Sequence, residues 1–348
     1  MKFGIVCSAE DPVVLESVKG IVGALQERGH KCELESGLPE LLKKKSEGVP
    51  VGSMSSKLIL AIGDDGAILR AFRELGSNSI PVLGISCGAM GFLAEIDVKN
   101  FGRALKRIER GGYSIEERSR LTVDMNGKKL PFALNELAIS ATRGATIVRY
   151  ELKVDGEVIF RDSADGIIVS TPTGSTGYAL SAGGPVVSPA SNVFVIIPIC
   201  SINQNKPFVV NNTSEVVISE ISSSSGCEAV IDGRYRVALS ENTLRIRKAP
   251  ANARFVRFEG GLHSRVFVKL KKKAETNDAI PKDAPPSAKF VYKLLQYEGA
   301  LTQKEIISAS MLPTRTVRSA LNYLVKNGLV TRQISIRDTR QSLYFVNL

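Results

Sequence analysis

Two glycine-rich segments of the chain combine the residue types that handle phosphate groups. The first is Gly63-Asp64-Asp65-Gly66, which follows the apolar run Leu58–Ile62 and precedes a helix-like stretch. Glycines let the backbone approach a phosphate closely, and a helix N-terminus offers unpaired N–H groups. A carboxylate at such a turn can hold Mg²⁺ or take a proton from an attacking hydroxyl. Asp-Gly turns at strand ends are also common structural features, so this motif alone leaves both interpretations open.

The second segment is more specific and covers residues 165–185. It runs from Asp165 through the apolar strand-like Gly166–Ser170 into the hydroxyl-rich and glycine-rich stretch Thr171–Tyr178, and it ends with Gly183-Gly184-Pro185. Hydroxyl and backbone donors in a glycine-rich bend suit phosphate and ribose oxygens, and Tyr178 could stack on a base. A purely structural loop rarely needs this many hydroxyls beside this many glycines. The segment therefore predicts a nucleotide site.

The elements that must position the first motif alternate between strand and helix over residues 1–118. Apolar runs predict strands, and apolar residues at helical spacing predict helices. The expected elements are strands at Phe3–Cys7, Leu58–Ile62 and Ile80–Ile85, and helices at Pro12–Arg28 and Ala67–Leu75. This alternation predicts an α/β domain in which helices cover a parallel sheet.

The second motif lies in residues 119–270, where the sequence pattern differs from that of residues 1–118 and predicts a β-sandwich domain. Short β-rich runs are separated by turn signals such as Asn126-Gly127 and Asp155-Gly156, which suit tight hairpins. The expected strands are Leu121–Met125, Leu137–Ser140, Tyr150–Val154, Val158–Phe160, Gly166–Ser170, Val193–Ile197, Glu215–Ile218 and Glu228–Ile231. Two packed sheets are the simplest arrangement for such a pattern.

Composition excludes several classes of protein. The 348 residues favour two or three domains, and five scattered cysteines without a CxxC pair argue against a disulfide framework or a zinc ribbon. With only His30 and His263, a Ser-His-Asp hydrolase or a His-rich metal site is disfavoured, and no metal-ligating residues are assigned. No apolar run reaches the ~18–20 residues of a membrane span. We expect a soluble cytoplasmic protein without a membrane partner.

The net charge of +11 is concentrated near the C-terminus. Residues 271–287 are rich in lysine and proline and predict a linker, and residues 288–348 carry nine Lys/Arg against three Asp/Glu. Three helix-like stretches followed by two strand-like ones predict a winged helix-turn-helix domain, similar to those of prokaryotic transcription regulators. Its candidate DNA-binding residues are Arg315 and Arg318 on the third helix and Arg337 and Arg340 at the wing tip. A solvated basic face on a dimerisation module is the alternative.

Over residues 1 to about 270 the chain resembles the NAD kinase family, whose members phosphorylate the 2′-hydroxyl of the adenosine ribose of NAD to give NADP. The family's Gly-Gly-Asp-Gly turn corresponds to Gly63–Gly66, and its Gly-x-x-x-Gly-x-x-Gly-Phe-Leu segment to Gly84–Leu93. Its Asn-Glu pair is Asn135-Glu136, its Ser-Thr-Pro-Thr-Gly-Ser-Thr-x-Tyr loop is Ser170–Tyr178, and a later Asp-Gly turn resembles Asp232-Gly233. The family fold, an α/β domain beside a β-sandwich, agrees with the elements expected above.

The resemblance implies a role for each matching residue. Asp65 would be the catalytic carboxylate that accepts the ribose proton, and Gly63 and Gly66 would cradle phosphate. Asp165 would lie beside the nicotinamide end and Phe92 near the adenine. The other residues expected to contact the dinucleotide are Asn135, Glu136, Thr176, Tyr178 and Ser181. The family uses Mg²⁺ with ATP or, in some members, polyphosphate, and commonly forms dimers or tetramers, so a homo-oligomer is expected.

Several departures from the family pattern keep a second function open. Asp64 stands where the family has a glycine, Ala67 where a hydroxyl residue is usual and Ser86 where asparagine is usual. The stretch Cys200–Pro207 lacks the family's Pro-His. We expect these departures to cluster on the side of the phosphoryl donor. The alternative to an NAD kinase is therefore a non-catalytic, NAD(P)-sensing transcription regulator. A related lipid or sugar kinase would share the Asp-Gly turn but would not account for Ser170–Tyr178.

Overall fold

The computed structural model describes residues 1–8, 11–88, 91–240, 243–258, 281, 284–299, 301–310, 312–334 and 342–346. The chain divides into two compact units, Met1–Val266 and Phe267–Leu348. Within the described residues, no helix has the length and apolar character that crossing a membrane requires. The expected linker at 271–287 lies outside the described residues, apart from residue 281 and residues 284–287.

The first unit begins with the expected parallel sheet, which is covered by helices on both faces. Its core strands point alternate side chains to opposite faces, as period-2 geometry requires. Helices α1 (Pro12–Glu27) and α4 (Phe101–Glu109) pack on one face with Leu58, Leu60 and Ile62, and α3 (Asp65–Leu75) packs on the other with Ile59 and Ala61. The strand order is β2 (Lys31–Leu34), β1 (Lys2–Cys7), β3 (Leu58–Ile62), β4 (Val82–Ser86), β19 (Ala253–Arg257) and β6 (Ser114–Arg118), and the short β5 (Ile96–Asp97) pairs with β4. The short elements are α2 (Leu38–Leu41), η1 (Val51–Ser53) and η2 (Val98–Asn100).

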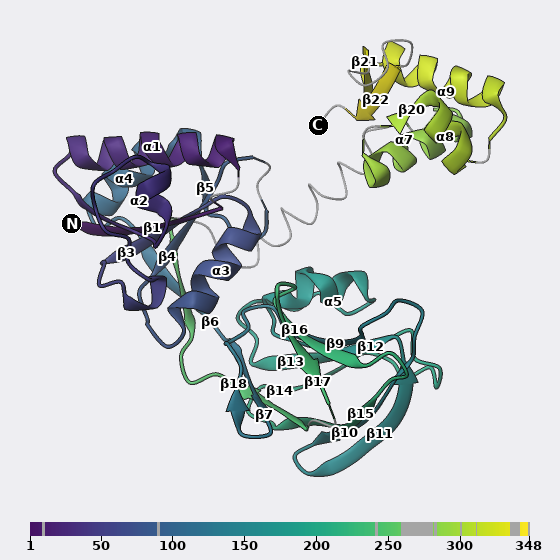
Figure 1. Ribbon diagram of the computed structural model, residues 1–348, viewed down its shortest axis with the longest axis horizontal. Coiled ribbons are helices and arrows are strands. Elements are labelled where there is room, and N and C mark those ends of the chain that lie inside the picture. The colour runs from purple at the N-terminus through teal and green to yellow at the C-terminus, as the bar shows by residue number, and fades with distance from the viewer. Residues whose placement is uncertain are drawn as a thin grey trace. The chain divides into compact units, whose positions relative to one another are not determined.

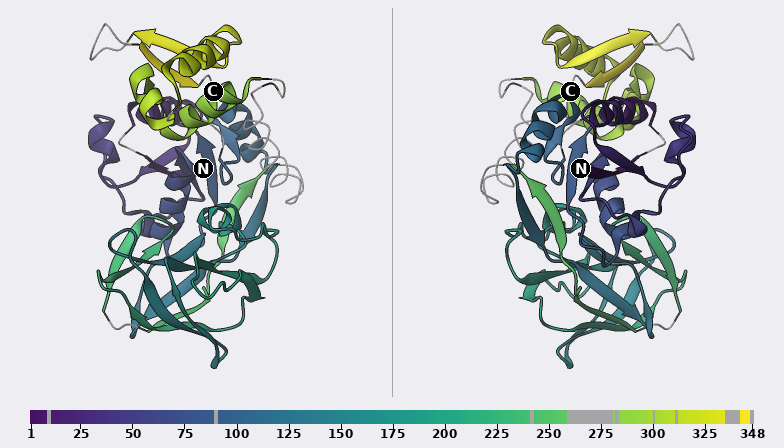
Figure 2. Two further views of the ribbon diagram at one scale, coloured as in Figure 1. Left: turned by 90° about the vertical axis from the view of Figure 1, so that its right-hand side faces the viewer. Right: turned by 90° about the vertical axis from the view of Figure 1, so that its left-hand side faces the viewer.

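Strands β2, β5, β6 and β19 of this sheet were not expected from the sequence, and β19 comes from the most distant part of the chain. Strand β19 follows the β-rich segment along the chain, yet it pairs in parallel with β4 and antiparallel with β6. In Figure 1 it is the green strand that lies among the purple and blue ones, and both views of Figure 2 show it beside a blue strand. The first sheet is therefore completed by residues from the far side of the β-rich segment.

The β-rich segment forms two antiparallel sheets that share one core, as expected. The first has the order β11 (Glu157–Ala164), β10 (Val148–Val154), β15 (Val216–Ser222), β18 (Leu244–Lys248), β7 (Leu121–Met125) and β8 (Lys128–Lys129). The second has the order β14 (Phe208–Asn211), β13 (Val193–Ile199), β12 (Gly166–Ser170), β9 (Glu136–Ala141), β16 (Cys227–Ile231) and β17 (Tyr235–Leu239). Side chains from both sheets, including Val123, Tyr150, Ile139 and Ile167, make up the buried core between them.

The described residues of the second unit form three helices and a three-stranded sheet around a separate core. Its elements are α7 (Pro286–Glu298), β20 (Leu301–Thr302), α8 (Gln303–Ser310), α9 (Thr314–Lys326), β21 (Val330–Ile334) and β22 (Ser342–Val346). Thr302 and Glu305 form a capping box at the start of α8, because Thr302 Oγ1 accepts from the amide of Glu305 at 3.3 Å and Glu305 Oε2 accepts from the amide of Thr302 at 2.7 Å. Helix α9 begins at Thr314, with Pro313 at the N-cap position.

Candidate functional site

The Gly63–Gly66 turn lies where strand β3 ends and α3 begins. Gly63 has φ +142°, a conformation that side-chain-bearing residues rarely adopt, and a Cβ there would lie 2.9 Å from Ser8 Oγ. The helix begins at Asp65 rather than at Ala67, because Asp64 is its N-cap and accepts from the amide of Ala67 at 3.0 Å. The acidic residue that departs from the family pattern therefore has a local structural role.

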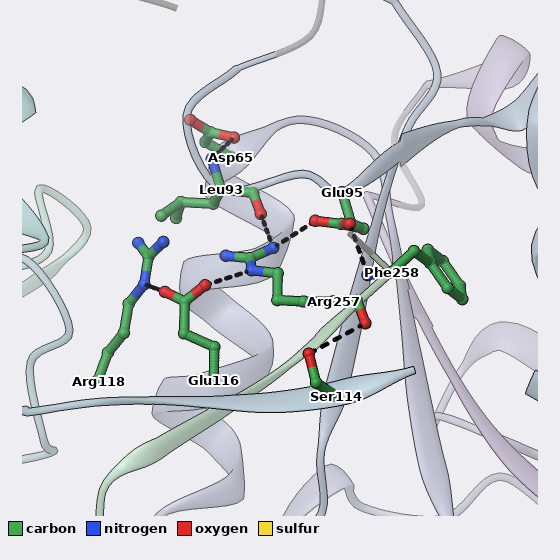
Figure 3. Close-up of polar contacts among 8 residues, drawn as sticks. All are labelled: Asp65, Leu93, Glu95, Ser114, Glu116, Arg118, Arg257 and Phe258. Carbon is green, nitrogen blue, oxygen red and sulfur yellow. Dashed lines mark hydrogen bonds and ion pairs between the residues drawn. The ribbon is translucent and has the colours of Figure 1, made fainter. Parts of the chain in front are cut away.

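Asp65 occupies the first turn of α3, and its carboxylate is held by a second backbone segment. Oδ2 accepts from the amide of Phe92 at 2.7 Å. Oδ1 accepts from the amide of Leu93 at 3.1 Å, a contact drawn in Figure 3. A Cβ on Gly91 would overlap the same carboxylate, so only glycine lets this segment approach so closely. Backbone donors stabilise an ionised carboxylate. The two segments thus fix the orientation of the predicted catalytic group.

The hydroxyl-rich loop and the Asn135-Glu136 pair form a second cluster. The carbonyl of Asn135 accepts from the amide of Thr171 at 2.8 Å, and a Cβ on Gly174 would collide with the backbone of Asn135. Asn135 Nδ2 and Glu136 Oε2 each lie 3.4 Å from the position that a Cβ on Gly177 would take. The loop glycines therefore let this backbone pack directly against the Asn-Glu pair.

This cluster contains buried polar atoms without partners. Neither Glu136 Oε2 nor Asn135 Oδ1 has a hydrogen-bond partner among the described residues, and Glu136 is only 4% exposed. Burial and the neighbouring Asp232 carboxylate raise the pKa of Glu136 to about 8. Leaving a buried polar atom unpaired costs about 1–3 kcal/mol, so such atoms call for a hydrogen-bonding partner.

The turn that follows β16 joins the two clusters. Asp232 is buried and accepts from the amides of Leu134, Asn135 and Glu136 at 3.0, 2.7 and 3.2 Å. Burial raises the pKa of Asp232 to about 6, although these amide donors act in the opposite direction. Two residues further on, the guanidinium carbon of Arg234 lies 3.0 Å from the position of a Cβ on Gly66. The Ser170–Tyr178 loop and the Gly63–Gly66 turn therefore face the same region of the protein.

A cavity of about 820 Å³ opens beside the Gly63–Gly66 turn. Its lining includes Ser8, Asp64, Ala67, Arg70 and Arg234. Arg70 is committed to Glu35, with Nη1–Oε2 and Nη2–Oε1 distances of 2.7 and 2.9 Å. The side chain of Arg234 makes no hydrogen bond or ion pair to any residue that the structure describes. Arg234 is thus the cation in this cavity that is available to an anion.

The other predicted contact residues differ in exposure. Phe92 and Thr176 are half-buried, whereas Tyr178 is 48% exposed and Ser181 is exposed. Thr176 closes the short η3 (Gly174–Thr176), and α5 (Tyr178–Ser181) carries the other two loop residues. The segment therefore presents the hydroxyls of Thr176 and Ser181 and the ring of Tyr178 at the surface. The other loop hydroxyls, those of Ser170, Thr171, Thr173 and Ser175, are buried and stabilise the loop itself.

Within one chain, Asp165 lies far from the Asn135-Glu136 cluster. It precedes β12, while Ser170 at the other end of that strand is paired with Glu136. At about 3.3 Å per residue, Asp165 and Thr171 are about 20 Å apart. The exposed Asp165 instead neighbours Cys200, whose pKa is raised chiefly by a hydrogen bond to that carboxylate.

The departures from the family pattern do not form one cluster, contrary to expectation. Asp64 and Ala67 both line the 820 Å³ cavity. Cys200–Pro207, by contrast, follows β13 at the end of the sheet where Asp165 lies, and the amide of Ile202 donates to the carbonyl of Ser163 at 2.9 Å. The antiparallel pairing of β12 with β13 places Cys200 beside Asp165, at the opposite end of β12 from Ser170.

The remaining predicted residues lie outside this site. Arg315 and Arg318 are exposed on α9, and Arg337 and Arg340 lie outside the described residues. His30 bridges Glu109 and the amino group of Met1, a surface role, and His263 lies outside the described residues. All five cysteines are free, and no cluster of three or more metal-ligating residues occurs in the described part of the chain.

Sequence reasoning missed two residues of the site, Arg234 and Arg257. Arg234 directly follows the recognised Asp-Gly turn, so its position beside that motif was an available signal. Arg257 Nη1 donates to the carbonyl of Leu93 at 3.3 Å, 164 residues away in sequence, which no local pattern could reveal (Figure 3).

A parallel sheet with an acidic phosphate-type turn, joined to a sandwich with a hydroxyl-rich loop, defines a nucleotide-binding phosphotransferase. Comparison with known families gives the same class. The ATP-NAD kinase N-terminal domain matches residues 12–113, and the ATP-NAD kinase C-terminal domain matches residues 134–258. The chain is 37% identical over 273 residues to an NAD kinase of Methanothermobacter thermautotrophicus, covering 78% of this chain and 96% of the relative. It is 39% identical over 278 residues to an NAD kinase of Thermococcus gammatolerans, covering 78% and 100%. The chain therefore belongs to the NAD kinase family.

Solved structures agree with this assignment. An NAD kinase from Archaeoglobus fulgidus in complex with ATP is similar with a TM-score of 0.63 and 30% identity, covering 78% of this chain and 99% of that one. A yeast NADH kinase complexed with NADH has a TM-score of 0.71 at 20% identity, covering 82% and 90%, and supports the fold alone.

Proposed function

We propose that this enzyme transfers the γ-phosphoryl group of ATP to the 2′-hydroxyl of the adenosine ribose of NAD, giving NADP and ADP. The observation that carries the proposal is the buried, unpartnered pair Glu136 Oε2 and Asn135 Oδ1 beside the Ser170–Tyr178 loop. Such atoms suit the hydroxyl and amide groups of a dinucleotide. The exposed ring of Tyr178 offers a stacking surface, and Thr176 a hydroxyl, for the same ligand.

In this reaction Asp65 accepts the proton of the ribose 2′-hydroxyl. The ribose oxygen attacks the γ-phosphorus of ATP, and the bond between the γ-phosphorus and the ADP oxygen breaks. The amides of Phe92 and Leu93 orient the carboxylate, so the base is preorganised. The guanidinium of Arg234 faces the cavity beside Gly66 and can offset the charge of the donor's phosphates. Phosphoryl transfer depends mainly on such positioning and charge compensation.

The donor set also fits Mg²⁺, which usually binds one or two carboxylates together with substrate phosphates. Asp64 is exposed at the cavity and Asp65 is adjacent, so these two residues would hold the ion. When bound, it would neutralise charge on the transferring phosphoryl group.

The test is NADP formation by the full-length protein with NAD, Mg²⁺ and either ATP or polyphosphate. We expect Asp65→Asn to lower kcat by at least 100-fold with an unchanged circular dichroism spectrum. Asp64→Asn is the matched control, because asparagine still caps α3 and only the charge is lost. We expect it to raise the Mg²⁺ concentration required while leaving the fold intact. Measurable NAD binding without NADP from either donor would overturn the proposal and favour a dinucleotide sensor.

We further propose that the chain acts as a cytoplasmic homo-oligomer in which Asp165 of a second copy reaches the dinucleotide. Within one chain Asp165 is about 20 Å from the Asn135-Glu136 cluster, at the other end of β12. Light scattering measures the mass of the assembly. Mixing Asp165→Ala with Asp65→Asn protein should restore part of the activity that neither variant has alone, and a lack of recovery would contradict the shared site.

For the second unit we propose a winged helix domain that binds DNA. The three helices and three strands that the structure describes here support this layout, and exposed Arg315 and Arg318 lie near the start of α9. A recognition helix meets DNA through such positions. The +6 charge of residues 288–348 favours a polyanionic partner.

This second proposal is tested on the full chain with a fluorescent random-sequence DNA duplex at several salt concentrations. We expect salt-sensitive binding that weakens in Arg315→Ala and Arg318→Ala. Lys326→Ala is the matched control, because this exposed lysine lies about 16 Å from Arg315 and about 12 Å from Arg318 along the same helix. Equal loss in all three variants, or no binding at low salt, would favour the dimerisation module.

A further inference from the structure

We propose that Arg257 is a positioning residue for the phosphoryl-transfer reaction, acting through the backbone of Leu93 on the Asp65 carboxylate. The inference rests on the role of Asp65 proposed above. It assigns a function to a side chain that comes from β19, the strand that returns to the first sheet.

Leu93 is held from two sides (Figure 3). Its amide donates to Asp65 Oδ1 at 3.1 Å, and its carbonyl accepts from Arg257 Nη1 at 3.3 Å. The side chain of Leu93 is buried in the core that includes Phe72 and Phe255. Because both contacts are made by the same residue, a displacement of the Leu93 carbonyl would also move the Leu93 amide, which orients the Asp65 carboxylate.

Arg257 is itself fixed by charged partners. Nε donates to Glu116 Oε2 at 2.7 Å, Nη1 donates to Glu95 Oε2 at 3.1 Å, and the guanidinium lies 4.6 Å from the centre of the Phe255 ring. Glu95 is also held by the amide of Phe258 at 2.9 Å. The planar guanidinium is therefore preorganised to reach three acceptors in different directions.

The charge balance of the cluster explains how it stays buried. Arg257 is 6% exposed and Arg118 is 7% exposed, and both contact the glutamate that lies between them, Glu116. Burial disfavours the Glu116 carboxylate, but the two arginines outweigh that effect and hold its pKa below the ordinary value. Among the contacts that the structure describes, two arginines therefore balance two glutamates. The contact to Leu93 is an addition to these ion pairs.

The decisive variant is Arg257→Lys, because it separates charge from geometry. A lysine ammonium keeps the positive charge opposite Glu95 and Glu116, but it cannot reproduce the directed fork that also reaches the carbonyl of Leu93. If Arg257 were only a counter-ion, Arg257→Lys would recover activity along with stability. If it positions Leu93, kcat falls by about 10-fold to 100-fold while the KM for NAD changes less than about twofold.

Arg120→Lys is the matched control. Arg120 is also a buried arginine that donates to backbone carbonyls, with distances of 2.9 Å to Ala251 and of 3.1 and 2.8 Å to Phe72 and Gly76 at the far end of α3. We expect this control to lower the melting temperature and to leave kcat within about twofold of the unsubstituted enzyme.

The experiment measures kcat, the KM for NAD, the melting temperature and amide exchange of the peptide containing Leu93, all in the full chain. We expect Arg257→Lys, but not Arg120→Lys, to speed exchange at Leu93 and to lower kcat. In an Asp65→Asn background, Arg257→Lys should change the residual rate less than about twofold. If the residual turnover of the Asp65→Asn proteins is too slow to measure, amide exchange at Leu93 still reports the effect of Arg257→Lys.

The outcomes distinguish this inference from the proposed function. Undiminished kcat in Asp65→Asn would refute the assignment of the base. Reduced kcat in Asp65→Asn together with normal kcat and normal Leu93 exchange in Arg257→Lys would leave the base in place and overturn the role of Arg257. An equal loss from Arg257→Lys with and without Asp65 would also overturn it, because the arginine would then act by another route.

Discussion

Glu136 gives a quantitative prediction, because its carboxyl group is buried without a partner for Oε2. Its pKa is raised from 4.5 to about 8, so between these pH values the folded protein retains a proton that the unfolded chain releases. The resulting stability is fully present below pH 4.5 and is lost as the pH rises through 8. At 1.36 kcal/mol per pH unit, the loss is about 3 kcal/mol at pH 7 and approaches about 5 kcal/mol above pH 8.

Glu136→Gln removes this titration and keeps the shape of the protonated side chain. We therefore expect the variant to be more stable than the unsubstituted protein by about 3 kcal/mol at pH 7, with the difference shrinking towards pH 5. Equilibrium urea unfolding at pH 5, 6, 7 and 8 measures this difference in stability. Glu157→Gln, at an exposed hairpin of the same domain, is the control. A stability difference that does not change with pH would refute the reasoning.

Three further predictions concern backbone groups. Arg120→Met leaves the carbonyls of Ala251, Phe72 and Gly76 without their donor, so we expect a loss of about 2–4 kcal/mol in thermal unfolding; an unchanged melting temperature would contradict this. Gly63→Ala should cost about 1–3 kcal/mol and reduce NADP formation, because φ is +142°; wild-type values of both would show that the turn tolerates a Cβ. Thr302→Ala should destabilise the start of α8 by about 1 kcal/mol, seen as faster amide exchange there, and equal exchange rates would argue against the capping box.

Local signals were sufficient for much of the fold. Asn126-Gly127 and Asp155-Gly156 form hairpin turns with φ values of +52° and +88°, and of +51° and +87°, as their residue types predicted. Leu58–Ile62, Leu121–Met125 and Gly166–Ser170 are strands with the expected bounds. Each of these features is determined by residues that are adjacent in sequence.

What could not be predicted depends on distant contacts. The pairing of β19 with β4 joins segments about 170 residues apart, and the charges of Arg257 and Glu116 gave no sign that they would be buried together. The separation of Asp165 from the Asn135-Glu136 pair within one chain was not expected, for a different reason. Its motif neighbours are close in sequence, but a straight strand carries Asp165 to the opposite end of the sheet.

The return of β19 has a consequence for how the enzyme is made. During synthesis β4 and β6 emerge long before residues 253–257, so the strand that lies between them arrives only after the whole sandwich has been translated. Until then both strands have unpaired edges, which are open to wrong partners. A nascent chain that stopped before residue 253 would lack both the strand that joins β4 to β6 and the arginine that contacts Leu93. Maturation of the catalytic turn is thereby linked to completion of the β-sandwich.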